Sequence, residues 1–185
     1  MTHCHSPLPA AHCPLLTARP AVFFDRDGVL NVDVNYLYKI EDFCWIAGAK
    51  EAIKYYNMKG YYVFVVTNQS DVARGYYSED DVTKLHNWMQ TQLSQVGAHI
   101  DEFSHCPHHP DGIVEKYKLA CECRKPQPGL LQNALNKWSV DKENSLLIGD
   151  KLSDIQAAEA AGIKGYLFQG NNLFDFIRSL EGQTV

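Results

Sequence analysis

Carboxylates follow directly after the first apolar run of the sequence, residues 21–24. Asp25 and Asp27 are two residues apart, so on an extended chain their side chains point to the same side. Two carboxylates this close repel each other unless they share a proton or a cation lies between them. Because Mg²⁺ prefers oxygen ligands, we expect it at this position, with Asp150 as its third ligand. Taken alone, Asp-x-Asp-Gly is also a common turn sequence with solvated carboxylates.

Other polar side chains come just after separate apolar runs or loops. Thr67 offers a hydroxyl group, Asn68 an amide, Lys125 a cation and Asp154 a further carboxylate. Together with a metal ion, these groups would bind a small anion such as phosphate. Arg26, between the two aspartates, is expected to point away from them and to lie at the surface or at the edge of a sheet.

Four metal-ligating side chains lie within 106–123: Cys106, His108, Cys121 and Cys123. Four protein ligands close the tetrahedron around Zn²⁺ and leave no position for water, which is typical of a structural site. We therefore expect zinc to brace the loop 105–125, so that its last residues, Arg124 and Lys125, point at the substrate. His105 and His109 are expected to be exposed or to lie beside the ligands.

The other cysteines are scattered, without the spacing of a disulfide framework. Zinc bound in a reducing cytosol fits the pattern better, and we expect a cytoplasmic protein. Cys44 is predicted to be a small buried hydrophobic residue. Residues 1–20 contain four prolines and are predicted to form a flexible tail, not a secretory signal. Metal binding in this tail would be adventitious; its potential ligands are His3, Cys4, His5, His12 and Cys13.

The composition of the 185 residues favours one folded domain, residues 21–185. Apolar residues make up 45% of the chain, enough for a sizeable core. A net charge of −5 argues against a broad basic surface for nucleic acid. The longest apolar run, YYVFVV at 61–66, is far shorter than the roughly 20 residues of a membrane-spanning helix. We expect a small-molecule ligand, no nucleic-acid or membrane partner, and a monomer.

Apolar strands alternate with amphipathic helices along the chain. Continuous apolar runs that end at polar residues predict strands at 21–24, 61–67, 100–105, 145–149 and 165–168. Helical periodicity predicts helices at 47–59, 78–96, 129–138, 154–161 and 174–180. This alternation predicts a doubly wound, Rossmann-like α/β sheet, mostly parallel, with helices on both faces and ligands beyond the carboxyl ends of the strands.

Taken in order, these motifs resemble those of the haloacid dehalogenase superfamily of phosphotransferases. The four motifs correspond to FFDRDGVLN, VVTNQS, CRKP and GDKLSD, and the resemblance covers about residues 21–170. It implies that Asp25 is the nucleophile, that Asp27 is the general acid and base, and that Thr67 and Lys125 complete the catalytic set. Asp27 further implies phosphate ester hydrolysis, because the superfamily's transporting ATPases carry Thr there and its dehalogenases lack this Asp.

Within the superfamily, the chain resembles the D-glycero-D-manno-heptose 1,7-bisphosphate 7-phosphatase family. The similar stretches are NVDVNYLYKIEDF, TNQSDVARG, CECRKPQPG and the long zinc loop HPDGIVEKYKLA. The alternative is a phosphatase of histidinol phosphate, whose family has a shorter zinc loop, or of another small sugar phosphate. The resemblance implies Mg²⁺ and Zn²⁺ as cofactors, no large cap domain, and a sugar bisphosphate substrate from nucleotide-activated heptose biosynthesis. The implied substrate contacts are Asn68, Arg74, Arg124, Lys125 and Lys151.

One position departs from that family. It usually has Gly where this chain has Asp71, in TNQSDVARG. A carboxylate close to a phosphate pocket would weaken phosphate binding by charge repulsion. We therefore expect the Asp71 side chain to face solvent.

Overall fold

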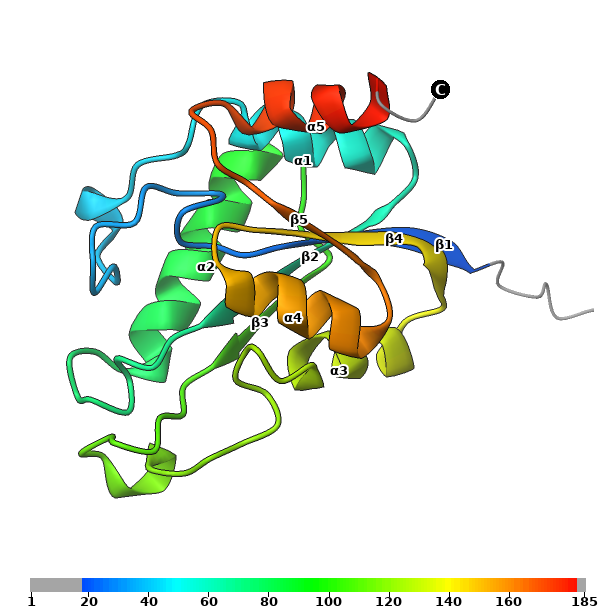
Figure 1. Ribbon diagram of the computed structural model, residues 1–185. Coiled ribbons are helices and arrows are strands. Elements are labelled where there is room, and N and C mark those ends of the chain that lie inside the picture. Colours follow the sequence, from blue (N-terminus) through cyan, green and yellow to red (C-terminus); the bar gives the residue numbers. More distant parts are fainter. Residues whose placement is uncertain (1–17, 183–185) are drawn as a thin grey trace, which may run out of the picture.

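Five strands, all paired in parallel, form one sheet in the order β3-β2-β1-β4-β5 (Figure 1). The computed structural model describes residues 18–182. The strands are β1 (Arg19–Phe24), β2 (Tyr62–Asn68), β3 (Glu102–Cys106), β4 (Val140–Gly149) and β5 (Lys164–Leu167). The helices are α1 (Ala49–Met58), α2 (Glu79–Ser94), α3 (Gly129–Lys137), α4 (Leu152–Ala161) and α5 (Leu173–Gly182), with short 3₁₀ helices η1 (Ile40–Asp42) and η2 (Glu115–Tyr117). The predicted doubly wound α/β fold is therefore confirmed.

Helices cover both faces of the sheet, which explains why the central strand β1 is apolar on both sides. Val22 and Phe24 pack in the core formed with α1, α2 and α5, whereas Ala21 and Phe23 pack in the core formed with α3 and α4 (Figure 1). All four side chains are fully buried. Strand alternation thus divides one continuous apolar run between two cores.

The long helix α2 begins with the capping box that its sequence predicts. The Ser78 hydroxyl oxygen accepts a hydrogen bond from the Asp81 amide at 3.2 Å, and the Asp81 carboxylate accepts one from the Ser78 amide at 3.0 Å. The side chains that it buries recur at helical spacing along one face: Val82, Leu85, His86, Met89 and Leu93. With this face, α2 packs against the same side of the sheet as α1 and α5.

Two strands begin earlier than the apolar runs that predicted them. β1 starts at Arg19, inside the predicted tail, and pairs there with the polar start of β4, which begins at Val140 and not at residue 145. The register of β1 on β4 shifts between Asp141 and Leu146. The exposed residues 142–144 lie in this irregularity, and no apolar pattern marks this part of the strand. The rest of the predicted tail, residues 1–17 with their histidines and cysteines, lies outside the described residues.

The prediction that Cys44 is buried is wrong. Its side chain is exposed, while its neighbours Phe43 and Trp45 pack against the core. In an extended segment successive side chains point to opposite sides. Two inward-facing rings therefore turn the residue between them outward.

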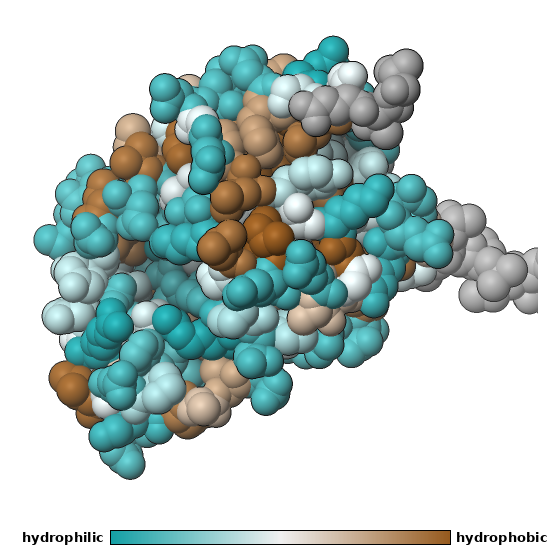
Figure 2. Space-filling view, viewed as in Figure 1, coloured by the Kyte–Doolittle hydropathy of each residue, from teal (hydrophilic) through white to brown (hydrophobic). Residues whose placement is uncertain are grey.

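The face of the molecule seen in Figure 2 is mostly hydrophilic, with apolar side chains in separate patches. Large apolar residues that are exposed include Met58, Ile113 and Leu152. Isolated exposed side chains of this kind are ordinary at protein surfaces. Among residues 18–182, no helix combines the length and the apolar content needed to cross a membrane.

Replacing Phe23 with alanine is expected to lower the free energy of unfolding by about 3–5 kcal/mol, because the lost ring leaves a cavity between the sheet and its helices. Phe23 is fully buried, and its ring centre lies 5.0 Å from that of Phe64. Urea unfolding followed by circular dichroism measures the change. Met58→Ala, at a residue that is 79% exposed, is the control and should stay within about 0.5 kcal/mol of the wild type. Equal losses in both variants would contradict this packing.

Candidate active site

A pocket of about 510 Å³ lies beyond the carboxyl ends of the central strands. Residues after β1, β2 and β4 and from the loop before α3 line it, so segments far apart in the sequence converge where a ligand is expected. The predicted site residues that line the pocket are Asp25, Asp27, Thr67, Asn68, Arg74, Arg124, Lys125 and Lys151. Asp154 also lines it.

Three carboxylates converge beside this pocket. One oxygen each of Asp25, Asp150 and Asp154 lies within 4.8 Å of the other two. The Oδ1 atom of Asp150 is buried without a hydrogen-bond partner, and burial raises the pKa of this carboxyl. Burial also raises the pKa of Asp25, to about 6, against the opposing charge of Lys125. A hard dication would satisfy these oxygens, so the three side chains fit Mg²⁺.

The third member of this carboxylate group is Asp154, where Asp27 was predicted. Asp25 and Asp150 meet as expected, whereas the Asp27 side chain is directed elsewhere. Asp154 comes close to the end of β4 because Gly149 has no side chain: a Cβ atom there would lie 2.2 Å from the Cβ of Asp154. The motif GDKLSD contains both Asp150 and Asp154. Only the turn from β4 into α4 shows that both carboxylates face Asp25.

Asp27 is held by donors on both of its carboxylate oxygens. Oδ1 accepts from Asn31 Nδ2 at 2.9 Å, and Oδ2 accepts from Gln69 Nε2 at 2.8 Å and from Arg26 Nη2 at 2.9 Å. Burial by itself would raise the pKa of Asp27, but the Arg26 charge and these hydrogen bonds hold it below its usual value. Asn31 and Gln69 were not predicted as site residues, although both lie within the motifs FFDRDGVLN and VVTNQS.

The prediction that Arg26 lies at the surface and points away from the site is wrong. The residue is 1% exposed, and its Nη2 lies 3.0 and 2.9 Å from the two Asp27 oxygens. Strand geometry ends here, because the Arg26 carbonyl accepts the amides of Leu30 at 2.9 Å and Asn31 at 3.1 Å in a turn. The alternation of an extended chain therefore no longer decides where this side chain points.

Lys125 reaches the carboxylates from the loop before α3. Its Nζ lies 2.9 Å from Asp25 Oδ1 and 2.6 Å from Asp154 Oδ1, and it donates to the Val66 carbonyl at 2.8 Å. The residue is 3% exposed. Burial by itself would lower the pKa of Lys125, but the charges of Asp25 and Asp154 outweigh it and raise the pKa. Lys125 is therefore a fixed cation between two carboxylates.

Two predicted site residues at the end of β2 make contacts within the protein. Asn68 Nδ2 donates to the Lys125 carbonyl at 3.0 Å, and Asn68 Oδ1 accepts the Lys125 amide at 3.0 Å. Thr67 Oγ1 accepts from Gln69 Nε2 at 2.9 Å. The Asn68 side chain thus fixes the backbone that carries Lys125, a role that its position after a strand did not indicate.

Three cations that were predicted to contact the substrate line the pocket: Arg74, Arg124 and Lys151. Arg74 pairs with Asp71 at 3.2 Å, and Lys151 pairs with Asp33 at 3.4 Å. Arg124 Nη1 is buried without a hydrogen-bond partner, so it can donate a hydrogen bond to a bound anion. The prediction that Asp71 faces solvent is wrong, because its side chain is 19% exposed and lines the pocket beside Arg74.

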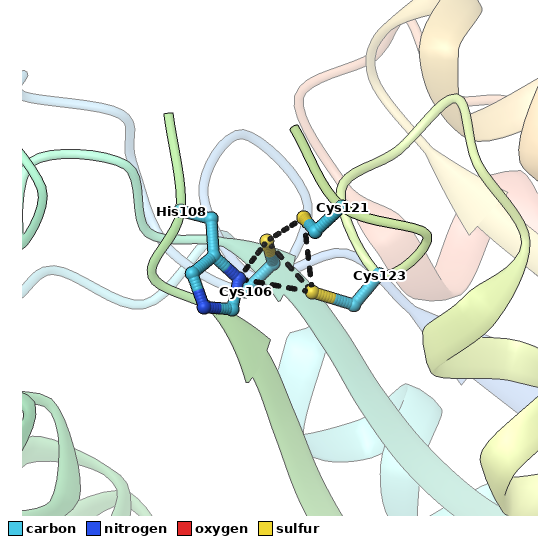
Figure 3. A group of neighbouring side chains, drawn as sticks. All are labelled: Cys106, His108, Cys121 and Cys123. Carbon is cyan, nitrogen blue, oxygen red and sulfur yellow. Dashed lines mark hydrogen bonds between the residues drawn. The ribbon is translucent and has the colours of Figure 1, made fainter. Parts of the chain in front are cut away.

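The predicted zinc ligands converge at the end of β3 (Figure 3). Cys106 Sγ lies 3.0 Å from Cys123 Sγ and 3.4 Å from Cys121 Sγ, and His108 Nδ1 lies 3.3 Å from Cys123 Sγ. Three thiols and one imidazole nitrogen are a common donor set for tetrahedral Zn²⁺. Burial raises the pKa of the Cys106 and Cys123 thiols, and a bound dication would hold them as thiolates. The four side chains therefore fit a structural zinc site.

Similarity to known proteins assigns the chain to a family. A family model described as "HAD-hyrolase-like" matches residues 122–172. The D-glycero-beta-D-manno-heptose-1,7-bisphosphate 7-phosphatase of Rhodopseudomonas palustris is 48% identical over 162 residues, which are 88% of this chain and 90% of the relative. The chain belongs to the heptose-1,7-bisphosphate 7-phosphatase family.

Other members of the heptose-1,7-bisphosphate 7-phosphatase family agree in sequence and in structure. The D-glycero-alpha-D-manno-heptose-1,7-bisphosphate 7-phosphatase of Photorhabdus laumondii is 48% identical over 141 residues, 76% of this chain and 77% of the relative. The crystal structure of D,D-heptose 1,7-bisphosphate phosphatase from B. bronchiseptica, complexed with magnesium and phosphate, has a TM-score of 0.73 at 32% identity. The superposition covers 86% of each chain. The relatives named for the alpha and the beta anomer have the same identity to this chain, 48%, over matched stretches of different length.

Cys121→Ser is expected to abolish stoichiometric zinc binding, because it weakens one of four converging donors. The zinc content of the purified protein, measured by mass spectrometry of the elements, tests this. Cys44→Ser changes an exposed cysteine outside the cluster and should keep the wild-type zinc content. Zinc loss should also speed hydrogen exchange in the loop 106–125 more than in β1 or β2. Full zinc retention in Cys121→Ser would contradict this ligand set.

Proposed function

We propose that this protein is a phosphatase that hydrolyses the 7-phosphate of D-glycero-D-manno-heptose 1,7-bisphosphate, in nucleotide-activated heptose biosynthesis. The observation that carries the proposal is the convergence of Asp25, Asp150 and Asp154, with the buried ammonium of Lys125 between Asp25 and Asp154. A carboxylate nucleophile beside fixed cations suits phosphoryl transfer, in which catalysis is mostly positioning and charge stabilisation. Family membership supports the choice of substrate.

In the first step, a carboxylate oxygen of Asp25 attacks phosphorus and forms an aspartyl-phosphate, while the bond from phosphorus to the sugar oxygen breaks. The protonated carboxyl of Asp27 gives its proton to the sugar oxygen, which leaves as an alcohol. A phosphate dianion close to Asp27 raises the pKa of this carboxyl, because like charges disfavour its ionised form. Lys125, 2.9 Å from Asp25 Oδ1, keeps the nucleophile in place.

In the second step, the ionised Asp27 takes a proton from water while the water oxygen attacks phosphorus. The bond between phosphorus and Asp25 breaks, which restores the Asp25 carboxylate and releases inorganic phosphate. Asp27 is then protonated again for the next turnover. A Mg²⁺ ion held by Asp25, Asp150 and Asp154 would neutralise part of the charge on the phosphoryl group.

The remaining cations of the pocket support a doubly phosphorylated substrate. Lys125 is buried between two carboxylates, whereas Arg74 and Lys151 pair with carboxylates at the partly exposed wall of the pocket and Arg124 Nη1 has no partner. The side chains of Arg74, Arg124 and Lys151 can therefore turn to phosphate groups. A bisphosphate carries up to about four negative charges, so several cations are needed to compensate it. Arg124 directly follows Cys123, and zinc bound by the cysteine cluster would therefore hold this guanidinium against the pocket.

The protein, supplied with Mg²⁺, is expected to hydrolyse heptose 1,7-bisphosphate with a kcat/KM at least about tenfold above that for fructose bisphosphate or histidinol phosphate. Histidinol phosphate offers the pocket cations only one phosphate group, and fructose bisphosphate carries its two phosphate groups on a shorter sugar. Steady-state release of phosphate measures the preference. The α and β anomers are assayed separately, which identifies the pathway branch. A preference for histidinol phosphate would reject the proposed substrate and support the alternative activity.

Asp25→Asn is expected to lower kcat by at least about 10³-fold, because the amide cannot form the aspartyl-phosphate. The substitution keeps the side-chain shape, so thermal unfolding should still show a folded protein. Asp80→Asn makes the same change at an exposed carboxylate of α2 and should keep wild-type turnover. Retained activity in Asp25→Asn would show that another group attacks phosphorus.

A further inference from the structure

The Arg26 guanidinium is buried and directed at the Asp27 carboxylate. Its Nε lies 3.2 Å from Oδ1, and its Nη2 lies 3.0 Å from Oδ1 and 2.9 Å from Oδ2. Within residues 18–182, Asp27 is the only carboxylate with which Arg26 forms an ion pair. A buried guanidinium is costly unless its charge is compensated and its donors are used. The pairing with Asp27 therefore decides where this side chain lies.

Neutral groups hold the guanidinium in this orientation. Nη2 donates to the Leu37 carbonyl at 3.2 Å and to Gln69 Oε1 at 3.1 Å. A ring nitrogen of His86 lies 3.5 Å from Nη1, and burial together with the Arg26 charge lowers the pKa of His86 well below its usual value. His86 therefore adds no second positive charge beside Arg26.

Gln69 connects Arg26 with Asp27 a second time. Its Nε2 donates to Asp27 Oδ2 at 2.8 Å, while its Oε1 accepts from Arg26 Nη2 and from the Tyr77 hydroxyl at 2.7 Å. An amide that donates and accepts in this way cannot turn without losing several hydrogen bonds at once. The orientation of the Asp27 carboxylate is thus set by a closed network at the ends of β1 and β2.

We propose that Arg26 is a positioning residue for Asp27: its planar fork fixes the carboxyl group so that the proton is delivered to the leaving sugar oxygen. This inference rests on the proposed phosphatase mechanism, in which Asp27 is the general acid. A misplacement of about 1 Å in a catalytic group can cost about 100-fold in rate. A lysine keeps the charge of Arg26 but cannot reproduce the two-pronged contact.

The positioning role predicts a dependence on the leaving group. A sugar alkoxide is a poor leaving group and needs a proton in the transition state, whereas p-nitrophenolate leaves with little help. If Arg26 only supported the fold, or if it bound the phosphate group directly, both kinds of substrate would suffer equally, because they share the phosphoryl group.

The experiment compares kcat/KM of Arg26→Lys and the wild type on heptose 1,7-bisphosphate and on p-nitrophenyl phosphate. We expect a loss of about 10- to 100-fold on the sugar substrate, but less than about threefold on the aryl substrate, where proton donation matters little. Asp27→Asn removes the acid itself, so it sets the largest difference between the losses of kcat/KM on the two substrates. Tyr77→Phe removes only the hydroxyl that donates to Gln69, and it should show a smaller loss with the same preference for the aryl substrate.

Arg178→Lys is the matched control, because Arg178 is an exposed arginine of α5 whose ion pair is with Glu181. It should leave both rates unchanged. Equal losses of Arg26→Lys on both substrates, or no loss on either, would overturn the positioning role. A wild type that cleaves other alkyl phosphates but not heptose bisphosphate would reject only the proposed substrate, and the comparison would then use the best alkyl phosphate. Equal losses of Asp27→Asn on both substrates would reject the acid role and the inference with it.

Discussion

The structure depends on holding three carboxylates together, of which Asp25 and Asp154 are buried and Asp150 is partly buried. Asp25, Asp150 and Asp154 repel one another, and burial raises the pKa of the first two. The Lys125 ammonium bridges Asp25 and Asp154 and offsets part of this repulsion. The buried Oδ1 of Asp150 still lacks a partner, which is why a dication fits the group. The parallel pairing of β1 with β4 brings the ends of these strands side by side and makes the arrangement possible.

Lys125 comes from a loop, and the loop is fixed from two sides. Cys123, one of the four side chains that fit zinc, lies two residues before it, and the side chain of Asn68 binds its backbone amide and carbonyl from the end of β2. On the other side, the Gly129 amide at the start of α3 donates to the Glu122 carbonyl at 2.8 Å. The cysteine and histidine cluster is therefore connected to the carboxylate group through a few residues of chain.

Two aspartates separated by one residue meet different environments. Burial, together with the charges of Asp154 and Asp27, raises the pKa of Asp25. Burial would also raise the pKa of Asp27, but the Arg26 charge and the hydrogen bonds from two amides lower it. A dication beside Asp25 would lower the pKa of Asp25, and a phosphate dianion beside Asp27 would raise the pKa of Asp27, so each ligand reverses the shift that the protein alone produces. In the proposed mechanism, ligand binding thus prepares Asp25 as an ionised nucleophile and Asp27 as a proton donor. Different surroundings, more than different residue types, separate the two roles.

The sequence by itself determined the kinds of element, their order and the types of ligand. The apolar run 21–24, the Cys-x-His and Cys-x-Cys pairs and the polar ends of the strands are local patterns, and local patterns depend only on neighbouring residues. Only the tertiary structure decided which carboxylates meet, where Arg26 points and how far β4 extends. Asp154 meets Asp25, a turn directs Arg26 toward Asp27, and Arg19 and Pro20 pair with the polar start of β4. All three depend on contacts or backbone geometry that no local pattern of residue types records.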